Sequence, residues 1–217
     1  MDRDDVEPGY VKPEYPTGLR ERKKERTRQA LSDAAIALFL AKGFDGVSVA
    51  EVAAAAEVSK PTLFRYFPAK EDLVLHRFAD HEGESARVVE AGKVYGTPPL
   101  DALYEHLVEG LERRDPVTGL CDVPAVLAYH RLLYGTPALL ARVHGFQMNS
   151  EAALAEVLGG DPLTARLAAG QITAVLRILA DDNVARLAAG DPVEEVARDA
   201  TTAAEGAFRS LRQGLPY

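Results

Sequence analysis

Residues 44–70 read FDGVSVAEVAAAAEVSKPTLFRYFPAK, and this stretch is the most specific part of the sequence. Ser48 and Glu51 have the spacing of a capping box, in which each side chain satisfies a backbone N–H of the other residue. Val47 and Val52 have the spacing of the hydrophobic staple that accompanies such a box. The helix that begins here is short and almost entirely alanine, so another helix can approach its backbone closely.

A second short helix is predicted directly after a tight turn. Glu57 and Val58 form the turn, Ser59 is placed to cap the helix, and residues 60–67 read KPTLFRYF. Two short helices joined by about three residues form a helix-turn-helix.

The second helix has two distinct sides. At about 100° per residue, Leu63 and Phe67 fall together and are expected to face inward. The other side chains point elsewhere: Pro61 and Arg65 opposite, Thr62 and Tyr66 on one flank, and Phe64 on the other. Cations, a threonine and aromatic rings suit a DNA groove, where they contact guanine edges, phosphates and thymine methyl groups. The alternative is a surface helix without a partner, which clustered exposed aromatics disfavour.

The stretch from Ala30 to Phe78, above all residues 44–53 and 58–70, resembles the tetracycline-repressor (TetR) family. The resemblance implies that these residues read or straddle the major groove: Lys60, Thr62, Phe64, Arg65 and Tyr66. It also implies that Ser48 and Lys70 bind phosphates at the starts of their helices, where anions are favoured. Ala50 departs from the family pattern, since many relatives carry a polar or basic residue there, so we expect base readout to rest on residues 60–66.

Charge is segregated along the chain. The net charge is −8 over 217 residues, yet residues 18–70 carry +4 and residues 71–217 carry −9. The basic run 20–28 reads RERKKERTR, and Arg26 and Arg28, nearest the motif, are its candidate DNA contacts. The alternative is a solvated helical turn with ordinary ion pairs three residues apart. This distribution is typical of a protein that touches DNA with one end.

The remainder of the chain predicts helices throughout, so the expected fold class is all-α. N-cap residues followed by proline, and glycines at helix ends, indicate nine helices. Their expected ranges are 19–42, 49–56, 60–67, 70–92, 98–114, 122–134, 137–158, 162–189 and 192–212. The expected organisation is a flexible leader at 1–18, a DNA-binding domain at 19–69, and an effector-binding and dimerisation domain at 70–217.

Two sets of residues in the C-terminal domain are functional candidates. Apolar stripes on the last two helices resemble the family's dimer interface, with these members: Leu167, Val175, Ile178, Val196, Ala200, Ala204 and Phe208. The alternative is that both stripes are buried against other helices of the same subunit. Aromatic and histidine side chains form the candidate effector pocket: Tyr104, His106, Tyr129, His130, Tyr134, His144 and Phe146. The alternative for each is an ordinary core or surface position.

Several function classes are disfavoured. A single cysteine, Cys121, excludes an internal disulfide and predicts a small buried hydrophobe. The acidic N-terminus does not read as a secretory signal, and the longest apolar run, residues 34–41, is too short to span a bilayer. We find no motif for catalysis, and His76 and His81 are off-register for a helical metal site. We therefore expect a cytoplasmic protein that is not an enzyme and needs no cofactor or metal.

These observations predict a homodimeric transcriptional repressor that a small-molecule effector releases from a palindromic DNA operator. The helix expected at 70–92 connects the two domains and is the predicted lever between them. The alternatives are an activator with the same DNA-binding module, and a helical small-molecule-binding or interaction protein without operator recognition.

Overall fold

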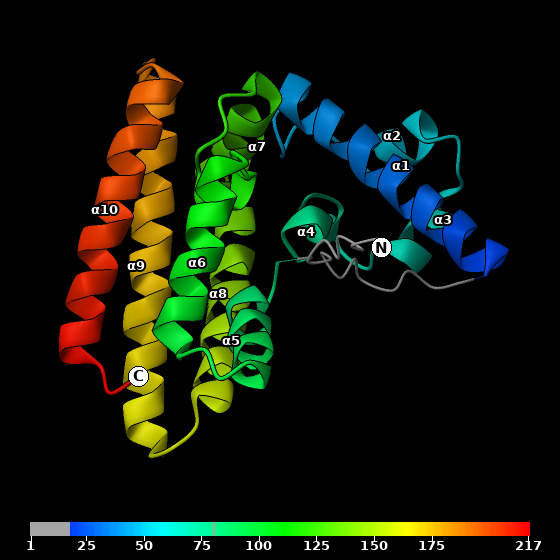
Figure 1. The fold of residues 1–217 in the computed structure, drawn as a ribbon. Helices are drawn as coiled ribbons and strands as arrows, with labels where there is room; N and C mark the ends of the chain where they lie inside the picture. The colour runs from blue at the N-terminus through cyan, green and yellow to red at the C-terminus, as the bar shows by residue number, and fades with distance from the viewer. Residues whose placement is uncertain (1–17, 80) are drawn as a thin grey trace, which may run out of the picture.

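The computed structural model describes residues 18–79 and 81–217, so the leader expected at 1–18 lies outside this range except for Gly18. These residues form ten α-helices and one short 3-10 helix, and the described ranges contain no β-strand, which confirms the all-α class (Figure 1). The helices are α1 (Leu19–Lys42), α2 (Val49–Ala55), α3 (Lys60–Tyr66), α4 (Asp72–Ala79), α5 (Glu84–Val94), α6 (Pro99–Glu112), η1 (Pro116–Thr118), α7 (Pro124–Gly135), α8 (Pro137–Leu158), α9 (Pro162–Ala189) and α10 (Val193–Gly214).

The N-terminal helices α1 to α4 surround one hydrophobic core. Phe39 of α1, Leu63 of α3 and Leu73 of α4 are almost fully buried in it. Two later helices complete this core, because Leu133 of α7 and Leu139 of α8 are buried in the same cluster. The N-terminal core therefore contains residues from both sides of the domain boundary expected between residues 69 and 70. The division of the chain into two domains at this boundary stays a prediction.

The C-terminal bundle has a second core. Helices α5, α6, α8, α9 and α10 lie side by side, with α8 packed on α5 and α9, and α10 packed on α6 and α9 (Figure 1). Phe208, Ile172 and Leu100 are fully buried among them. Cys121 is buried with a free thiol, as expected. The bundle is thus a closed packing of long helices beside the smaller N-terminal module.

The expected single helix at 70–92 is wrong. The chain forms α4 and α5 instead, separated by a turn in which Gly83 has a left-handed φ of 69°. Glycine adopts this conformation without steric cost, so the chain changes direction here between the two groups of helices. The predicted lever is therefore two short helices joined by a bend.

Helix α9 is unusual in its composition. Among the described residues it alone is long and apolar enough to cross a membrane by length and composition, with an 18-residue window of mean hydropathy 1.3. Only 22% of that window is buried inside the protein. Leu163, Leu167 and Ile178 on this helix are 64%, 59% and 55% exposed. Helix α9 therefore presents an uncovered apolar stripe.

Candidate nucleic-acid interface

The start of α2 is built as the sequence predicts. The Glu51 N–H donates to Ser48 Oγ at 3.2 Å, and the Ser48 N–H donates to Glu51 Oε2 at 2.8 Å. Lys42 Nζ lies 3.1 Å from the other carboxylate oxygen. The backbone N–H of Ser48, helped by Lys42, lowers the pKa of Glu51 to about 2. Because the Ser48 hydroxyl also donates to Glu51, the phosphate contact expected from Ser48 competes with a bond inside the protein.

The turn and the start of α3 also follow expectation. Glu57 takes a positive φ of 54°, and the Val58 N–H donates to the Ala53 carbonyl at 2.9 Å. Ser59 Oγ accepts a hydrogen bond from the Thr62 N–H at 3.2 Å. Pro follows at the first turn, where its missing N–H costs nothing. These local bonds set the angle at which α3 leaves α2.

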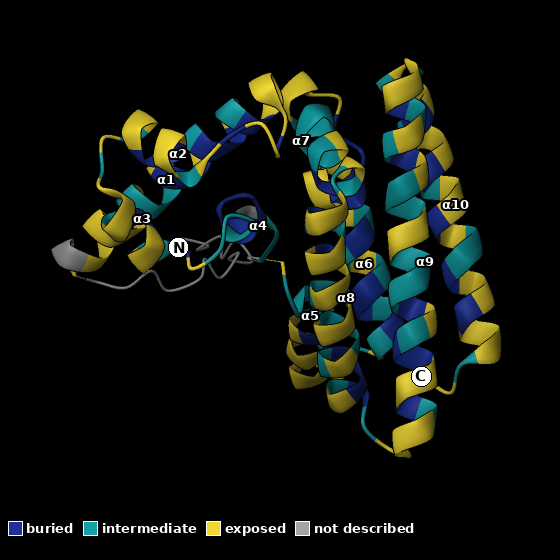
Figure 2. Ribbon diagram, turned by 180° about the vertical axis from the view of Figure 1, so that it is seen from behind, coloured by how far each residue is buried: buried dark blue, intermediate teal, exposed yellow. Residues whose placement is uncertain are grey.

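Helix α3 places its side chains as predicted. Leu63 and Phe67 are 0% and 1% exposed, so both face the core. Figure 2 shows that the opposite side of the helix is exposed. Phe64 is 41% exposed, and Lys60 Nζ lies 5.9 Å from the centre of its ring.

Of the other three α3 side chains expected to contact the DNA groove, one is exposed and two are half-buried. Arg65 is exposed, with its guanidinium 5.7 Å from the Tyr66 ring, whereas Thr62 and Tyr66 are half-buried on one flank. The outward side of α3 therefore combines two cations with aromatic rings on a rigid base.

Lys70 is held inside the module. Its Nζ donates to the Phe44 carbonyl at 2.5 Å and lies 4.2 Å from the centre of the Phe44 ring. Helix α4 begins at Asp72, whose carboxylate accepts the Ala69 N–H at 3.0 Å. The Lys70–Phe44 contact and the Asp72 carboxylate both compete with a phosphate at the start of α4. The phosphate contact expected for Lys70 stays a prediction, and it requires the Lys70 ammonium to leave Phe44.

The two arginines expected to contact the DNA backbone differ in their surroundings. Arg26 is exposed, whereas Arg28 is half-buried with its guanidinium 5.4 Å from the centre of the Phe67 ring. Glu25 lies 3.4 Å from Nε2 of the buried His76 on α4. Arg26 is therefore the better placed of the two for a phosphate, and Arg28 packs α1 against α3.

The candidate effector-pocket residues are tied to different neighbours. On the bundle side, the Tyr104 ring packs on Phe208 with centroids 5.5 Å apart, and His106 Nε2 lies 3.1 Å from Glu84. Tyr104 also borders an open depression of about 310 Å³, whereas a second depression of about 450 Å³ between α8 and α9 contains none of the seven residues.

The other candidates lie nearer the N-terminal module. The Tyr129 hydroxyl donates to the Val74 carbonyl at 2.8 Å and so connects α7 to α4. Phe146 packs on Phe78, and His144 is exposed. His130 stacks on Tyr134 at 4.2 Å; burial lowers the pKa of His130 and raises that of Tyr134. The structure does not show these seven side chains around one shared cavity, and their effector role stays a prediction.

The expected dimer interface needs a correction. Four of its members on α10 are buried inside one protomer, where they pack against α6 and α9: Val196, Ala200, Ala204 and Phe208. For these four residues the alternative interpretation is right, because an already buried stripe has no surface left for a partner. Leu167 and Ile178 are exposed, and Val175 is half-buried against the core of the bundle.

The fold and this site define a class: an all-α protein with a helix-turn-helix module joined to a helical bundle. Residues 31–76 match the sequence model described as "Bacterial regulatory proteins, tetR family". The chain is 34% identical over 143 residues to the HTH-type transcriptional regulator TcmR of Streptomyces glaucescens. That match covers 65% of this chain and 62% of TcmR.

The match to a second relative covers a shorter segment. The chain is 42% identical over 60 residues to the mycofactocin biosynthesis transcriptional regulator MftR of Mycobacterium tuberculosis, which covers 28% of this chain and 30% of MftR. The chain thus spans less than two thirds of the length of either relative.

Solved structures share the fold over most of its length. NalD of Pseudomonas aeruginosa, described as the secondary repressor of the MexAB-OprM multidrug efflux pump, has a TM-score of 0.60 at 21% identity. The match covers 88% of this chain and 98% of NalD. GusR of Salmonella enterica has a TM-score of 0.53 at 20% identity, covering 88% and 96% of the two chains. Residues 31–76 of this chain are therefore similar to the TetR family of bacterial regulatory proteins.

Proposed function

We propose that this protein is a cytoplasmic, homodimeric regulator of transcription that binds a palindromic DNA operator through α3 and is released from it by a small-molecule effector. The observation that carries the proposal is the outward side of α3, where Lys60, Phe64 and Arg65 are exposed over the buried Leu63 and Phe67. The relatives named as transcriptional regulators support this role, and none of those names describes an enzyme.

The chemistry of α3 fits the major groove. Arginine and lysine donate to the guanine edge or to phosphate oxygens, and an aromatic ring contacts the thymine methyl group. The charge distribution supports the same orientation, since residues 18–70 carry +4 while residues 71–217 carry −9. The acidic bundle is repelled by DNA, so the module approaches it with α3 leading.

The dimer is proposed on the uncovered stripe of α9. Leu163, Leu167 and Ile178 share one side of this helix at helical spacing, and all three are exposed. A contiguous exposed apolar surface marks an interaction site. A second copy related by a two-fold axis would cover the stripe, and a palindromic operator requires two copies of α3 related in this way.

Effector release requires coupling between the bundle and α3. A ligand that prefers a conformation with displaced α3 helices lowers operator affinity by its difference in affinity for the two conformations. Helix α4 is the proposed connection, because it shares a core with α1 and also contacts α7 through Tyr129 and Val74. Repression rather than activation is proposed from the family and from NalD, whose own description is that of a repressor.

The test begins with selection of operator fragments by the purified protein, followed by fluorescence-anisotropy titrations at several salt concentrations. Arg65→Ala is expected to weaken operator binding by about tenfold or more, since a base or phosphate contact of this kind contributes about 1–3 kcal/mol. Arg198→Ala is the matched control: this exposed arginine lies on α10, away from α3, and its loss should change affinity by less than about twofold.

The titrations also distinguish the alternative. A regulator binds its operator more tightly than random DNA, and added salt weakens the complex. Equal binding to operator and random fragments would overturn the proposal in favour of a helical small-molecule-binding protein.

A further inference from the structure

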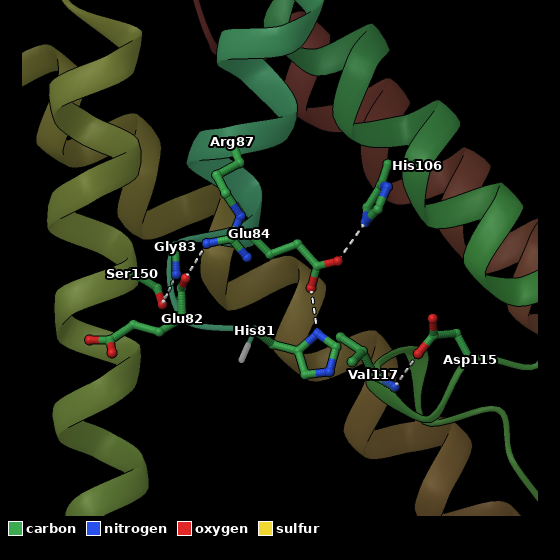
Figure 3. Close-up of polar contacts among 9 residues, drawn as sticks. All are labelled: His81, Glu82, Gly83, Glu84, Arg87, His106, Asp115, Val117 and Ser150. Carbon is green, nitrogen blue, oxygen red and sulfur yellow. Dashed lines mark hydrogen bonds and ion pairs between the residues drawn. The ribbon is translucent and has the colours of Figure 1, made fainter. Parts of the chain in front are cut away.

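A carboxylate at the start of α5, directly after the turn that follows α4, contacts two imidazoles (Figure 3). Oε2 of Glu84 lies 2.9 Å from His81 Nδ1 within the turn, and Oε1 lies 3.1 Å from His106 Nε2 on α6. His81 and His106 are separated in the chain by all of α5 and the first half of α6, so only the tertiary structure brings them to one carboxyl group. This cluster fastens the turn to α6.

The opposite side of the same turn is fastened to α8. The Gly83 N–H donates to Ser150 Oγ at 3.1 Å, and Asn149 Nδ2 donates to Glu82 Oε1 at 2.7 Å (Figure 3 shows Ser150 beside the turn). The turn itself is closed by the Glu84 N–H, which donates to the His81 carbonyl at 3.1 Å. The junction between the module and the bundle is therefore held from two helices at once.

The contacts on the α6 side pair imidazoles with a carboxylate. Histidine is the side chain that ordinarily titrates between pH 5 and 8. Burial opposes the charge of Glu84, but the hydrogen bonds from His106 and His81 hold its pKa well below its usual range. Glu84 therefore stays ionised near neutral pH.

The other groups around the cluster are a guanidinium, a carboxylate and neutral side chains. Arg87 donates to the Glu82 carbonyl at 2.6 Å, and the Asp115 carboxylate, which follows α6, accepts the Val117 N–H at 3.0 Å. On α8 the groups that meet the turn are the neutral Ser150 and Asn149. Guanidinium and carboxylate groups ordinarily keep their charge between pH 5 and 8.

We propose that His81, Glu84 and His106 form a proton-responsive clasp that holds the bend between α4 and α5 more firmly as the pH falls from 8 to 6, and that operator affinity depends on this clasp. The effect on the operator rests on the function proposed above. A neutral imidazole makes one hydrogen bond to the carboxylate, whereas an imidazolium adds an ion pair, which is stronger in a half-buried site. The stabilisation is thus present at low pH and is lost as the imidazoles deprotonate.

The clasp acts on DNA binding through α4. Leu73, Val74 and Leu75 of α4 lie in the same core as Leu63 of α3, so a change in the bend moves the module against the bundle. Proton binding to the clasp therefore changes how firmly the module is held against the bundle, and with it the affinity for the operator.

The first measurement needs no DNA. Hydrogen-exchange protection factors of the Gly83 and Glu84 amides are compared at pH 6 and pH 8 in the wild type and in the double variant His81→Gln, His106→Gln. We expect about threefold to tenfold greater protection at pH 6 in the wild type and no such increase in the double variant, because glutamine keeps a hydrogen bond but does not titrate. Equal behaviour of the two proteins overturns the clasp.

Two further variants guard against a merely structural effect. Glu84→Gln keeps the size of the side chain and removes the charge, so it should lose the pH dependence even if the turn stays folded. Glu90→Gln, at an exposed position of the same helix, should keep the wild-type dependence. A pH dependence that survives Glu84→Gln contradicts the clasp.

The second measurement uses the selected operator at constant ionic strength. The operator affinity of the wild type should differ by about threefold to tenfold between pH 6 and pH 8, and the double variant should lose this difference. The remaining histidines are common to both proteins, so the difference isolates the clasp. The salt slope of binding should be the same in both, because the clasp makes no phosphate contact.

The two measurements fail separately. If the amides respond to pH but no fragment binds specifically at any pH, the proposed function fails while the clasp stands. If operator binding is specific but has the same pH ratio in both proteins, the coupling of the clasp to α3 is wrong.

Discussion

Glu51 and Glu84 show how neighbouring donors determine what one carboxyl group does. Glu51 is exposed and accepts hydrogen bonds at the start of α2, whereas Glu84 is half-buried between two imidazoles. In both, hydrogen bonds lower the pKa. The partners of Glu51 are close in sequence and could be predicted from spacing. His81 is also close to Glu84, but nothing in the chain marks His106 as its second partner.

The stabilisation that Glu51 gives to the start of α2 should depend on pH. The pKa of Glu51 is lowered from 4.5 to about 2, so its stabilisation is fully present above the ordinary value and is lost as the pH falls through that interval. Urea unfolding between pH 6 and pH 2.5 should show a larger loss of stability for the wild type than for Glu51→Gln. Glu112→Gln, exposed on α6, should follow the wild type. Identical curves for Glu51→Gln and the wild type would contradict this role.

The helices themselves show where local signals suffice. Helices α1, α8 and α9 begin and end where expected, and Asp161 caps α9 by accepting the Thr164 N–H at 2.8 Å. The bend at Gly83 was missed because a glycine within a helical pattern does not reveal whether its φ is positive. The contact of η1 with α9 is likewise tertiary: Asn183 Nδ2 donates to the Thr118 carbonyl at 2.9 Å in the core.

Gly119 permits this contact, so its replacement should destabilise the packing of η1 on α9. A Cβ there would lie 2.1 Å from the Ala180 carbonyl oxygen, and the φ of 73° disfavours any other residue. Gly119→Ala should lower the free energy of unfolding by about 2 kcal/mol or more, measured by urea denaturation. Gly206→Ala, a helical position with nothing within 4 Å, should instead raise it by about 0.5–1 kcal/mol. A neutral Gly119→Ala would mean that η1 moves away from α9 freely.

At the scale of the whole molecule, two cores share helices across the junction. The N-terminal core recruits α7 and the beginning of α8, while the rest of α8 belongs to the bundle. Figure 1 shows α7 between the two groups of helices. Motion in the bundle therefore reaches the module through shared packing as well as through the turn at Gly83.

The proposed dimer can be tested by placing charges on the exposed apolar stripe of α9. Leu167→Glu with Ile178→Glu should convert the dimer into a monomer in sedimentation velocity, because two charges would be buried at the interface without partners. Operator affinity should fall in parallel, since each half-site would be bound singly. Val94→Glu is the control: Val94 is 78% exposed, lies on α5 and should leave the mass unchanged. A variant that stays dimeric would place the interface elsewhere.

The helix-turn-helix, its caps and the two sides of α3 follow from the amino-acid sequence, because caps, turns and helical faces depend on residues a few positions apart. Which apolar stripe stays uncovered depends on the packing of the helices: the stripe of α10 is buried against α6 and α9, whereas α9 keeps exposed leucines. The tertiary structure also decided that Lys70 turns toward Phe44 and that His106 reaches Glu84. Those contacts join distant parts of the chain, and their partners are chosen by how the helices pack.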